Sequence, residues 1–512
     1  MEILKRFLKP IDNFLNGITM YRLLIYCLVF LLAVAFYLSV FSVLPIKPFD
    51  LLFSIAFLIL VCLLANDVFA AVFKAPSNIE SVYITALILA LIITPIQSLS
   101  SLLFLIWAGV LAMASKYILA INKKHIFNPA AISVAITAFA INQPATWWVG
   151  NIYILPFVLA VGLLIVRKTR RADLVLGFFA TAVISILGNS FIHNLNMLTT
   201  LKTLVFYAPT LFFAFFMLTE PITTPPTTIL RVIYGGLVGA LFGPFVHLGS
   251  VYSTPELALS VGNIISYVVS PKEKLVMKLK NKVGAANSAY DFVFSPARSL
   301  GFKPGQYLEW TLFHEKPDSR GMRRYFTIAS SPTEKEIIMG VKFYEKPSSY
   351  KKALTSMDIG DTIVASQLAG DFTLPRNKNK KLVFVAGGIG VTPFRSMVKY
   401  LIDRNEKRDI VIFYSNKTMA DIAYRDIFDL AYKKLGIQTI HCLSDLNSLP
   451  SDWKGEKGFI NQEMIKKYVP DFAERIFYVS GPRIMVDAIG KIIKDAGIKK
   501  THIKKDFFSG FA

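Results

Sequence analysis

The sequence predicts a multidomain protein: an all-α polytopic membrane domain of about ten spans, then an antiparallel β-barrel, then an α/β domain. Three observations carry this prediction. The chain has 512 residues, which is too long for one ordinary hydrophobic core. Its hydrophobic fraction is 54% and its charged fraction is only 18%, against about 25% charged residues in a soluble domain. Near residue 275 the long apolar runs give way to short alternating segments.

The apolar runs lie in residues 1–270, which we expect to form the membrane domain. A spanning helix needs about 20 apolar residues. Two runs, 81–97 and 129–142, are short and are expected to be tilted or re-entrant. We expect no cleavable signal peptide, because the first run exceeds a signal core and further runs follow it. The runs are 20–43, 51–73, 81–97, 99–115, 129–142, 151–166, 172–189, 201–219, 229–249 and 255–270.

Basic residues predict the orientation of these runs. Lysine and arginine precede the first run and follow the second, fourth, sixth and tenth runs. The connections after the third, fifth, seventh and ninth runs carry none before the next apolar run, apart from Lys202. Because cytoplasmic loops of membrane proteins are rich in lysine and arginine, we expect a multi-pass inner- or plasma-membrane protein with both termini and residues 271–512 in the cytoplasm. Contact with anionic lipid also accounts for the net charge of +22, and no nucleic-acid motif is present.

The second half reads as two domains. Short apolar–polar alternations, as in residues 291–294 and 307–311, predict strands of a small barrel over residues 275–376. From residue 380, apolar strands alternate with helical patterns, which is typical of an open parallel sheet and predicts an α/β nucleotide-binding domain over residues 380–512. Its expected strands include Leu382–Val385, Ile410–Tyr414 and Ile476–Val479.

The segment Arg323–Pro332 combines a cation, aromatic rings and hydroxyl groups. An arginine offers a planar fork for a diphosphate, an aromatic ring can pack on a flavin, and a hydroxyl can bond the flavin N5 that accepts hydride. The pattern Arg-x-(Tyr/Phe)-(Ser/Thr)-x-x-Ser resembles the flavin motif of the ferredoxin–NADP reductase superfamily. Chemistry alone would also allow an ordinary edge strand. The resemblance implies FAD contacts from Arg324, Tyr325, Phe326, Thr327 and Ser330, with Thr327 at N5.

Flanking segments resemble further parts of the same superfamily. Tyr307 lies in a Pro-Gly-Gln-Tyr stretch at the superfamily's interval before the motif. Gly340 and Lys342 follow the motif, and then Ser348 and Ser349 begin an expected helix. A helix N-terminus is a suitable site for the FAD diphosphate. The superfamily's glycine-rich version is replaced here by Lys-Pro-Ser-Ser, which leaves the individual roles of the two serines open.

An apolar strand, a glycine-rich turn and a helix follow one another over Leu382–Phe394. Glycines let a backbone approach a diphosphate, and the helix dipole favours it. The sequence Gly-Gly-x-Gly-x-Thr-Pro resembles the nicotinamide half of the same superfamily. The resemblance implies NAD(P)H binding by Gly387, Gly388, Gly390, Thr392 and Pro393.

The segment Val479–Met485 resembles the superfamily's (Cys/Ser)-Gly-Pro-x-x-Met, which lines the nicotinamide. It implies contacts from Ser480, Gly481, Pro482 and Met485, with Ser480 as a catalytic-site residue beside Thr327. An aromatic C-terminal segment resembles relatives that place an aromatic ring near the flavin, without indicating which phenylalanine does so.

Together these resemblances imply that residues 275–512 bind FAD and NAD(P)H and transfer a hydride from nicotinamide C4 to flavin N5. The cofactors carry this chemistry, so no side-chain general base is required. The choice between NADH and NADPH stays open. Ser415, Asn416 and Lys417 follow the second strand and could hold a 2′-phosphate or form a solvated loop.

Other redox groups are poorly supported in the membrane domain. Haem requires paired histidine ligands within spans, and one iron–sulfur cluster usually requires four cysteines. The histidines lie near run ends without paired spacing, and the cysteines are far apart, so neither group is expected. These residues are His125, His193 and His247, and Cys27, Cys62 and Cys442.

Residues 124–131 and 216–228 resemble signatures of the Rnf/Nqr membrane-subunit family, that is, the D component of Rnf and the B component of Nqr. The resemblance extends over about residues 20–270 and implies the ten spans of that family. Both segments lie at expected cytoplasmic ends, and their spacing hints at a duplicated unit. Proline and polar residues at span ends are tolerated where they line a cavity, which suits a flavin or quinone. Two helix-capping turns are the alternative reading.

Members of that family carry covalent FMN on a threonine within (Ser/Thr)-Gly-Ala-Thr. The nearest match here is Gln143–Thr146, in an expected external loop, with proline in place of glycine. The resemblance therefore implies a second flavin, FMN or riboflavin, with Thr146 as its candidate attachment site. The adjacent Trp147 and Trp148 are expected to form an interfacial aromatic belt or to stack on a flavin.

The sequence thus predicts a membrane-bound NAD(P)H dehydrogenase. It would pass a hydride to FAD and then send electrons through the membrane domain to a quinone or to an extracytoplasmic carrier, with partner redox subunits as an option. The alternative is a flavin reductase anchored by, or independent of, a transporter-like membrane domain. Autonomous ion pumping is not favoured, because no buried acidic chain is evident. The acids near the runs are Asp67, Glu80 and Asp173.

Overall fold

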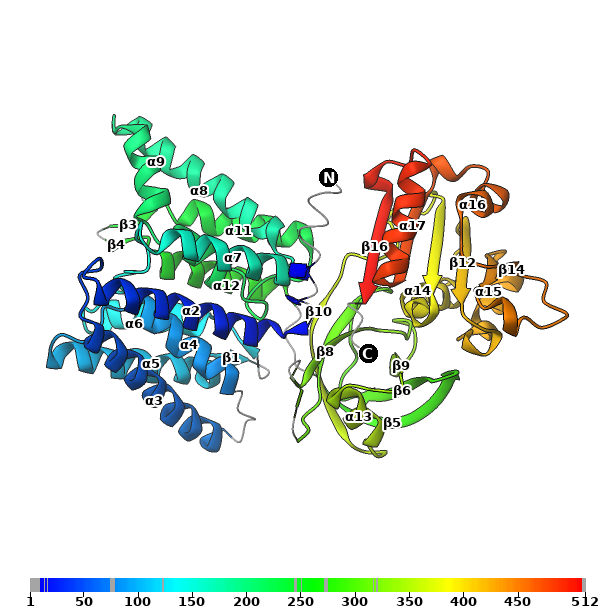
Figure 1. The fold of residues 1–512 in the computed structure, drawn as a ribbon, viewed down its shortest axis with the longest axis horizontal. Coiled ribbons are helices and arrows are strands. Elements are labelled where there is room, and N and C mark those ends of the chain that lie inside the picture. Colours follow the sequence, from blue (N-terminus) through cyan, green and yellow to red (C-terminus); the bar gives the residue numbers. More distant parts are fainter. Residues whose placement is uncertain are drawn as a thin grey trace. The chain divides into compact units, whose positions relative to one another are not determined.

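The computed structural model describes residues 10–12, 14–15, 17–73, 79–121, 124–243, 246–249, 251–270, 275–315, 317–318 and 321–508. The chain forms two compact units, Met1–Lys274 and Leu275–Ala512 (Figure 1). The first is helical, and the second contains two six-stranded sheets. Each unit is described by itself.

The helical unit contains two successive sets of elements in the same order. Each set ends with a two-stranded hairpin and a final helix. In each set the second helix packs on the helix that precedes this hairpin: α3 packs on α5, and α8 packs on α11. The sets meet where α6 packs on α12. The first set is α2 (Met20–Val40), α3 (Pro48–Val72), α4 (Ile79–Ile92), α5 (Leu99–Ile118), β1 (Ala120–Ile121), β2 (Lys124–His125) and α6 (Pro129–Ala140). The second is α7 (Leu155–Thr169), α8 (Ala172–Ile192), α9 (Met197–Phe206), α10 (Thr210–Phe212), η1 (Phe213–Met217), α11 (Thr228–Leu241), β3 (His247–Leu248), β4 (Val251–Tyr252) and α12 (Pro255–Val269).

Among the described residues, four helices are long and apolar enough to cross a membrane: α2, α3, α5 and α8. A fifth span results if α9 and the α10–η1 segment, which meet at 56°, are counted together. The prediction of ten spans is therefore not met. The helices α4, α6, α11 and α12 are apolar but have only 10–17 residues. The apolar runs 81–97 and 229–249 extend past the ends of α4 and α11. Apolar composition alone therefore does not show where these two helices end.

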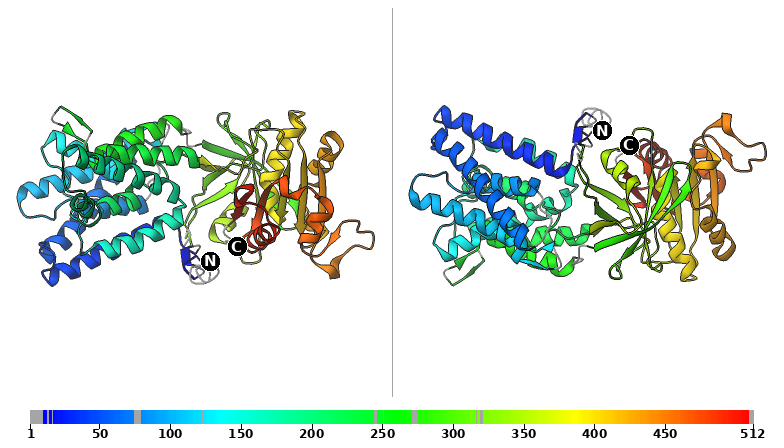
Figure 2. Two further views of the ribbon diagram at one scale, coloured as in Figure 1. Left: turned by 90° about the horizontal axis from the view of Figure 1, so that it is seen from above. Right: turned by 90° about the horizontal axis from the view of Figure 1, so that it is seen from below.

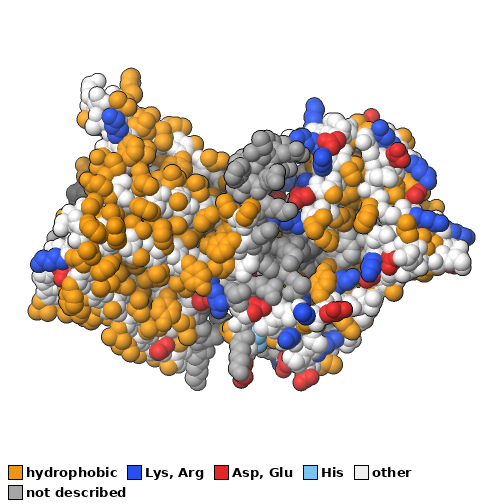
Figure 3. Space-filling view, viewed as in Figure 1, with side chains coloured by type: hydrophobic (Ala, Val, Ile, Leu, Met, Phe, Trp, Pro, Cys, Tyr) orange, Lys and Arg blue, Asp and Glu red, His pale blue; other side chains and the backbone are white. Residues whose placement is uncertain are grey.

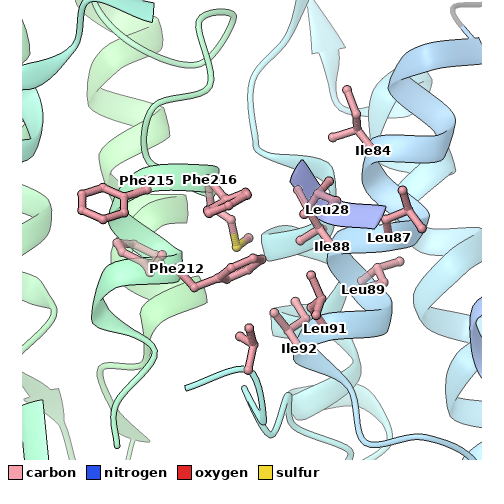
Figure 4. Packing of buried hydrophobic residues seen from close by; sticks show 14 of the residues in the cluster. Leu28, Ile84, Leu87, Ile88, Leu89, Leu91, Ile92, Phe212, Phe215 and Phe216 are labelled. Carbon is pink, nitrogen blue, oxygen red and sulfur yellow. The ribbon is translucent and has the colours of Figure 1, made fainter. Parts of the chain in front are cut away.

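The surface of the helical unit agrees with a lipid environment. Large apolar side chains cover its visible face (Figure 3), and Leu99, Phe49 and Ile229 are more than 70% exposed, at 73%, 76% and 74%. Apolar patches of this extent are rare on soluble monomers. The interior is also apolar: Phe216 of η1 lies on the side turned toward Ile84 and Ile88 of α4, whereas Phe215 points the other way (Figure 4).

The short helix α4 ends inside this unit, where the loop that follows α6 satisfies its last carbonyl groups. The amides of Thr146 and Trp147 each donate to the Ile92 oxygen at 2.9 Å. The Trp148 indole donates to the Ala90 oxygen at 3.0 Å. Backbone groups within a hydrocarbon region must find such partners inside the protein. This loop is therefore part of the packed unit.

Trp147 itself is buried, with 7% of its surface exposed, and its indole donates to the Glu256 carboxylate at 3.0 Å. The expectation of an interfacial aromatic belt is wrong for this residue. Glu256 is also buried, although the sequence analysis did not single it out. It lies in the first turn of α12, which begins at Pro255 as the predicted run does.

Glycines allow α8 and α11 to pack closely. A Cβ atom at Gly239 would overlap the Phe178 carbonyl oxygen, and one at Gly235 would overlap the Leu174 carbonyl oxygen. Thr181 Oγ donates to the Gly236 oxygen at 2.7 Å across the same contact. Small residues at four-residue spacing are typical of membrane helix contacts, because they let backbones approach.

We predict that Gly239→Ala destabilises the protein by about 1–3 kcal/mol, because the added methyl group overpacks the α8–α11 contact. Gly236→Ala is the matched control, since its Cβ would lie 3.5 Å from Thr181 Cγ2. That change should be neutral or slightly stabilising, as alanine favours a helix over glycine. Thermal unfolding in detergent measures both, and equal midpoints for the two variants would contradict the packing described.

The second unit begins with a curled antiparallel sheet in the order β8-β7-β10-β5-β6-β9, as the sequence predicted for a barrel. Helix α13 (Ser349–Ser356) closes it, and its core contains Trp310, Phe294 and Tyr350. Its strands are β5 (Leu275–Ala286), β6 (Ala289–Pro296), β7 (Tyr307–Thr311), β8 (Arg323–Thr327), β9 (Ile337–Lys342) and β10 (Thr362–Ala369).

The second sheet is parallel, in the order β14-β13-β12-β11-β15-β16, with helices on both faces (Figure 2). Its strands are β11 (Leu382–Gly387), β12 (Ile410–Asn416), β13 (Gln438–Leu443), β14 (Glu456–Lys457), β15 (Ile476–Pro482) and β16 (Ile503–Phe508). Between them lie η2 (Gly388–Val391), α14 (Thr392–Asp403), η3 (Met419–Asp421), α15 (Arg425–Leu435), η4 (Leu446–Ser448), α16 (Gln462–Tyr468), η5 (Phe472–Glu474), α17 (Arg483–Asp495) and η6 (Lys500–His502). The predicted open parallel sheet is thus observed.

Candidate active site

The parallel sheet changes direction at β11, which has β12 on one side and β15 on the other. Ligands of open α/β sheets bind at such a switch point, outside the carboxyl ends of the strands. The predicted glycine-rich turn and the predicted Ser-Gly-Pro segment meet there. A Cβ at Gly387 would overlap Met485 Sδ, and one at Gly390 would lie 2.5 Å from the Gly481 Cα. The backbone approach requires glycine at Gly390, whereas at Gly387 the Met485 side chain would have to move.

Ser480 lies at the same edge, opposite Ala386 in the β11–β15 register. Its side chain is fully buried, and its hydroxyl group finds no hydrogen-bond partner within the described part of the chain. A buried hydroxyl without a partner costs about 1–3 kcal/mol. A bound nucleotide at the switch point could supply the hydrogen-bond partner that the Ser480 hydroxyl lacks. Pro482 follows in the same strand, and its register partner is Phe508 of the C-terminal aromatic segment.

Thr392 and Pro393 begin α14 directly after the glycine-rich turn, and proline suits the first helical turn. Gly388 has a φ of +51°, a left-handed conformation that glycine adopts without strain. Backbone amides at this helix start can bind a diphosphate. The predicted NAD(P)H-binding residues of this turn therefore lie together at one edge of the sheet.

The predicted flavin strand β8 pairs with β7 so that Tyr307 is opposite Thr327. Thr327 is buried. The Tyr325 and Tyr307 rings meet edge to face at 5.7 Å, and the Tyr325 hydroxyl donates to Glu309 Oε2 at 2.7 Å. Three predicted flavin residues thus lie together on these two strands.

Arg324 and Phe326 meet Tyr350 of α13. The Arg324 guanidinium lies 5.1 Å from the centre of the Tyr350 ring, and the Phe326 and Tyr350 rings are 6.0 Å apart. Tyr350 is fully buried, and its hydroxyl donates to the Trp310 oxygen at 3.3 Å. Sequence reasoning missed Tyr350, although it directly follows the serines that were singled out. It fixes the arginine and the aromatic ring of the motif.

The N-terminus of α13 lies beside Arg324. Ser348 caps this helix by accepting a bond from the Lys351 amide. The Ser349 amide donates to Asp318 Oδ2 at 3.2 Å, and the other carboxylate oxygen of Asp318 lies 3.4 Å from Arg324 Nη2. An acidic group therefore already occupies the space between the helix start and the arginine. The same donors would suit a diphosphate of FAD.

Gly340 and Lys342 contact residues of the parallel-sheet domain. A Cβ at Gly340 would lie 2.6 Å from the Tyr424 hydroxyl. Lys342 Nζ pairs with Asp421 at 2.9 Å. Although partial burial opposes ionisation, hydrogen bonds from Lys342 and Thr418 hold the pKa of the Asp421 carboxyl below its ordinary value. Both residues thus join β9 to the parallel-sheet domain, and their predicted contact with FAD stays a prediction.

Polar contacts tie α14 to the segment that follows the flavin strand. Ser396 Oγ donates to the Ser330 backbone oxygen at 2.6 Å. Arg395 donates to the Ala329 backbone oxygen at 3.0 Å. Both terminal nitrogens of Arg395 also bond the Glu334 carboxylate. The helix that carries the glycine-rich turn is thereby fixed to the strand that carries Thr327. Sequence reasoning found Ser330 but not Arg395, Ser396 or Glu334.

A second tie is buried between the two sheets. The Tyr424 hydroxyl donates to Asp291 Oδ1 at 2.5 Å. Burial raises the pKa of the Asp291 carboxyl, with the hydrogen bond from Tyr424 and the charge of Arg395 opposing this effect. Tyr424 has a left-handed φ of +58°, which brings its ring to this position.

Thr146 is in the helical unit. Its side chain is exposed, and its hydroxyl donates to the Ile92 oxygen at 3.2 Å and accepts a bond from Thr94 at 2.9 Å. Covalent attachment of FMN there stays a prediction.

Comparisons with known proteins agree with this site. The family model described as an oxidoreductase NAD-binding domain matches residues 384–491. A glycine betaine monooxygenase reductase subunit of Chromohalobacter salexigens is 26% identical over 209 residues, covering 40% of this chain and 56% of that protein. The chain thus spans about half the length of this relative. NADH-cytochrome b5 reductase 1 of Mortierella alpina is 27% identical over 264 residues, covering 51% and 87%.

The F component of the Na(+)-translocating NADH-quinone reductase of Neisseria meningitidis is 29% identical over 264 residues, covering 46% of this chain and 64% of that protein. Among solved structures, the cytochrome b5 reductase domain of Ulva prolifera nitrate reductase aligns with a TM-score of 0.41 at 21% identity, covering 46% and 98%. From the sequence relatives, the C-terminal unit is an FAD- and NAD(P)H-dependent oxidoreductase unit of the ferredoxin–NADP reductase type.

We predict that Arg324→Ala weakens FAD binding at least about 10-fold, because hydrogen bonds to charged groups contribute about 1.5–3 kcal/mol. Arg323→Gln is the matched control, since Arg323 is the neighbouring arginine on the same strand and pairs with Glu309 at 3.5 Å. Flavin fluorescence during titration of the stripped protein with FAD gives both dissociation constants. Equal losses in the two variants would contradict the assignment of Arg324.

We predict that Asp291→Asn stabilises the protein near pH 7. A carboxyl whose folded pKa is raised contributes stability at low pH, and this contribution is lost as pH rises through the folded pKa. The amide cannot ionise, and its oxygen can still accept the Tyr424 hydrogen bond. The melting temperature of the variant should therefore exceed the wild-type value at pH 7, and the gap should close toward pH 4. Exposed Asp358→Asn is the control; a gap that does not depend on pH would contradict the cause given.

Proposed function

We propose that the chain is a membrane-bound NAD(P)H dehydrogenase that passes a hydride to FAD and then sends electrons through its helical unit. The acceptor is a quinone or a carrier beyond the membrane. The observation that carries this proposal is made at the switch-point edge of the parallel sheet. There the buried Ser480 hydroxyl, which has no hydrogen-bond partner within the described residues, lies beside the glycine-rich turn. The same chain contains helices that are apolar enough to cross a membrane.

The residues of the reductase unit fit both cofactors. Bound FAD supplies the chemistry that accepts a hydride and releases its electrons singly. Arg324 and the start of α13 would hold the diphosphate, and Phe326 would pack on the ring. Thr327 would offer its hydroxyl at N5, and Ser480 would face the nicotinamide. The hydrogen bonds from Arg395 and Ser396 of α14 to the backbone after β8 hold the flavin residues and the nicotinamide residues at a fixed distance from one another.

Membrane electron transfer is supported by the helical unit. Its two signature segments, residues 124–131 and 216–228, resemble those of the Rnf/Nqr membrane subunits. A hydrogen bond of 2.9 Å from Asn128 to Glu220 brings these segments together. Ten spans are not required for this role, because any interior cavity near the reductase side of the membrane could hold an acceptor.

The competing function is a flavin reductase that the helical unit merely anchors. Vesicles that contain the full chain distinguish the two, with NADH or NADPH added outside so that only outward-facing reductase units react. One sample receives a short-chain benzoquinone, one holds ferricyanide trapped inside, and one receives external ferricyanide, which takes electrons directly from an exposed flavin.

We predict rapid oxidation of the nicotinamide with the quinone or with the trapped acceptor. Oxidation with external ferricyanide alone would contradict electron transfer through the helical unit and would identify an anchored reductase. Loss of all three activities in Arg324→Ala, with restoration by excess FAD, shows that each route passes through the same flavin site.

A further inference from the structure

The contact between the two sheets of the reductase unit contains a buried acid, Asp291 of β6. Only 9% of its surface is exposed, and its Oδ1 accepts a hydrogen bond of 2.5 Å from the Tyr424 hydroxyl. Arg395, whose positive charge acts on this carboxyl, is itself paired with Glu334. A carboxyl that is buried against a neutral hydroxyl, and whose neighbouring cation already has a partner, is costly to ionise.

Asp291 lies next to the glycine-rich turn of the nicotinamide motif. It is opposite Gly340 in the β6–β9 register. A Cβ at Gly340 would lie 2.6 Å from the Tyr424 hydroxyl and 2.8 Å from Thr392 Cγ2. The same Cβ would lie 3.2 Å from Asp291 Oδ1. Because Thr392 begins α14 directly after the turn, a change at Asp291 reaches the turn through one packed layer of side chains.

Tyr424 is held at this contact from its own side. It has a left-handed φ of +58° directly before α15, and only 8% of its surface is exposed. The Arg395 guanidinium lies 5.7 Å from the centre of its ring. A residue other than glycine keeps a left-handed conformation only where its surroundings hold it there. The Tyr424 hydroxyl therefore has little freedom to follow the carboxyl if the two sheets separate.

Charges on several elements act on this pair. Arg395 of α14 favours the ionised Asp291 carboxyl, whereas Glu334, between β8 and β9, opposes it. Burial is the largest effect, and it raises the pKa of the Asp291 carboxyl above its ordinary value. Burial and the nearby carboxyl also raise the pKa of Tyr424 well above its ordinary value. The other titratable groups of this contact are Tyr414, Lys342 and Asp421.

We infer that Asp291 is a positioning residue for hydride transfer, and that its neutral carboxyl keeps the glycine-rich turn in place against the flavin strand. Loss of its proton would put an uncompensated charge between the sheets, draw water into the contact and loosen the packing beneath Thr392. The inference rests on the hydride-transfer step of the proposed function. It does not depend on the route that electrons take afterwards.

Neither Asp291 nor Tyr424 reacts. In the hydride step the C–H bond at nicotinamide C4 breaks, an N–H bond forms at flavin N5, and the hydride carries both electrons. The two side chains exchange no proton with either cofactor. Their effect is geometric, since a displacement of about 1 Å can lower such a rate about 100-fold.

The test uses the full chain in detergent, loaded with FAD, and follows flavin reduction in a single turnover after mixing with NADPH or NADH. The maximal rate of the wild type should fall at least about 10-fold as the pH rises, because the folded protein keeps the proton on Asp291 only below the raised pKa of this carboxyl. The coenzyme concentration that gives half of this rate should not change, since the contacts of the glycine-rich turn with the diphosphate are retained.

Asp291→Asn separates the charge from the hydrogen bond. Its amide cannot ionise, but its oxygen can still accept the bond from Tyr424. The variant should equal the wild type at low pH and should lose the fall in rate at high pH. Asp358→Asn, at an exposed position, is the control and should keep the wild-type pH profile.

Tyr424→Phe removes the donor and should lower the maximal rate at least about 10-fold at every pH. Tyr432→Phe is the matched control, because Tyr432 is on the same helix and is 64% exposed. A wild-type pH profile in Asp291→Asn would overturn the inference while hydride transfer stands. Failure of both coenzymes to reduce the flavin of the wild-type chain would instead contradict the proposed function.

A second measurement does not depend on turnover. When NADP+ or NAD+ is added to the anaerobic protein after reduction by dithionite, stacking of nicotinamide on the flavin ring gives a long-wavelength charge-transfer absorbance. This absorbance should weaken as the pH rises in the wild type and stay constant in Asp291→Asn. If Tyr424→Phe fails to fold, these two titrations decide the question. An equal loss of absorbance in both proteins would overturn the inference.

Discussion

The structure of the reductase unit depends on one contact, the attachment of α14 to the backbone after the flavin strand. Hydride transfer requires reacting groups to be held within about 3–3.5 Å of one another. Here the nicotinamide residues belong to the parallel sheet, and the flavin residues belong to the curled sheet. Ser396 and Arg395 bond the carbonyl groups of Ser330 and Ala329, and these bonds set the distance between the two groups of residues. The Tyr424–Asp291 hydrogen bond adds a second fixed point.

The helical unit obeys a different constraint, the need to satisfy backbone groups without water. Helix α4 is too short to span a bilayer, yet its last carbonyl groups accept bonds from the loop of Thr146, Trp147 and Trp148. Such a short helix leaves room beside it, and a cavity near Thr85 and Ile88 occupies part of this room.

Local sequence patterns predicted much of the site. Strand, glycine turn and helix around Gly387–Pro393, the segment at Ser480 and the strand with Arg324 and Thr327 each have a pattern that is complete within a few residues. The structure places them as the order of the motifs indicated. Such patterns are local because diphosphate and ring contacts dictate residue types at short spacing, and the cofactor contacts of the individual residues stay predictions.

Other features depend on contacts between distant residues, which no local pattern contains. Tyr424 and Asp291 are 133 positions apart, and Arg395 and Glu334 are 61 apart. The approach of Tyr424 to Gly340 is likewise not visible in any local pattern. Glu220 looked like a solvated helix end because the sequence does not show that Asn128, 92 positions away, lies beside it.

The central claim is that electrons leave NAD(P)H through one FAD and then enter the helical unit. The most direct measurement is to denature the purified chain and to quantify released and peptide-bound flavin by mass spectrometry. We expect one released FAD per chain. A second flavin, FMN or riboflavin, would support electron transfer across the bilayer, most directly as FMN attached to a peptide containing Thr146. A purified chain that holds no FAD would contradict the claim.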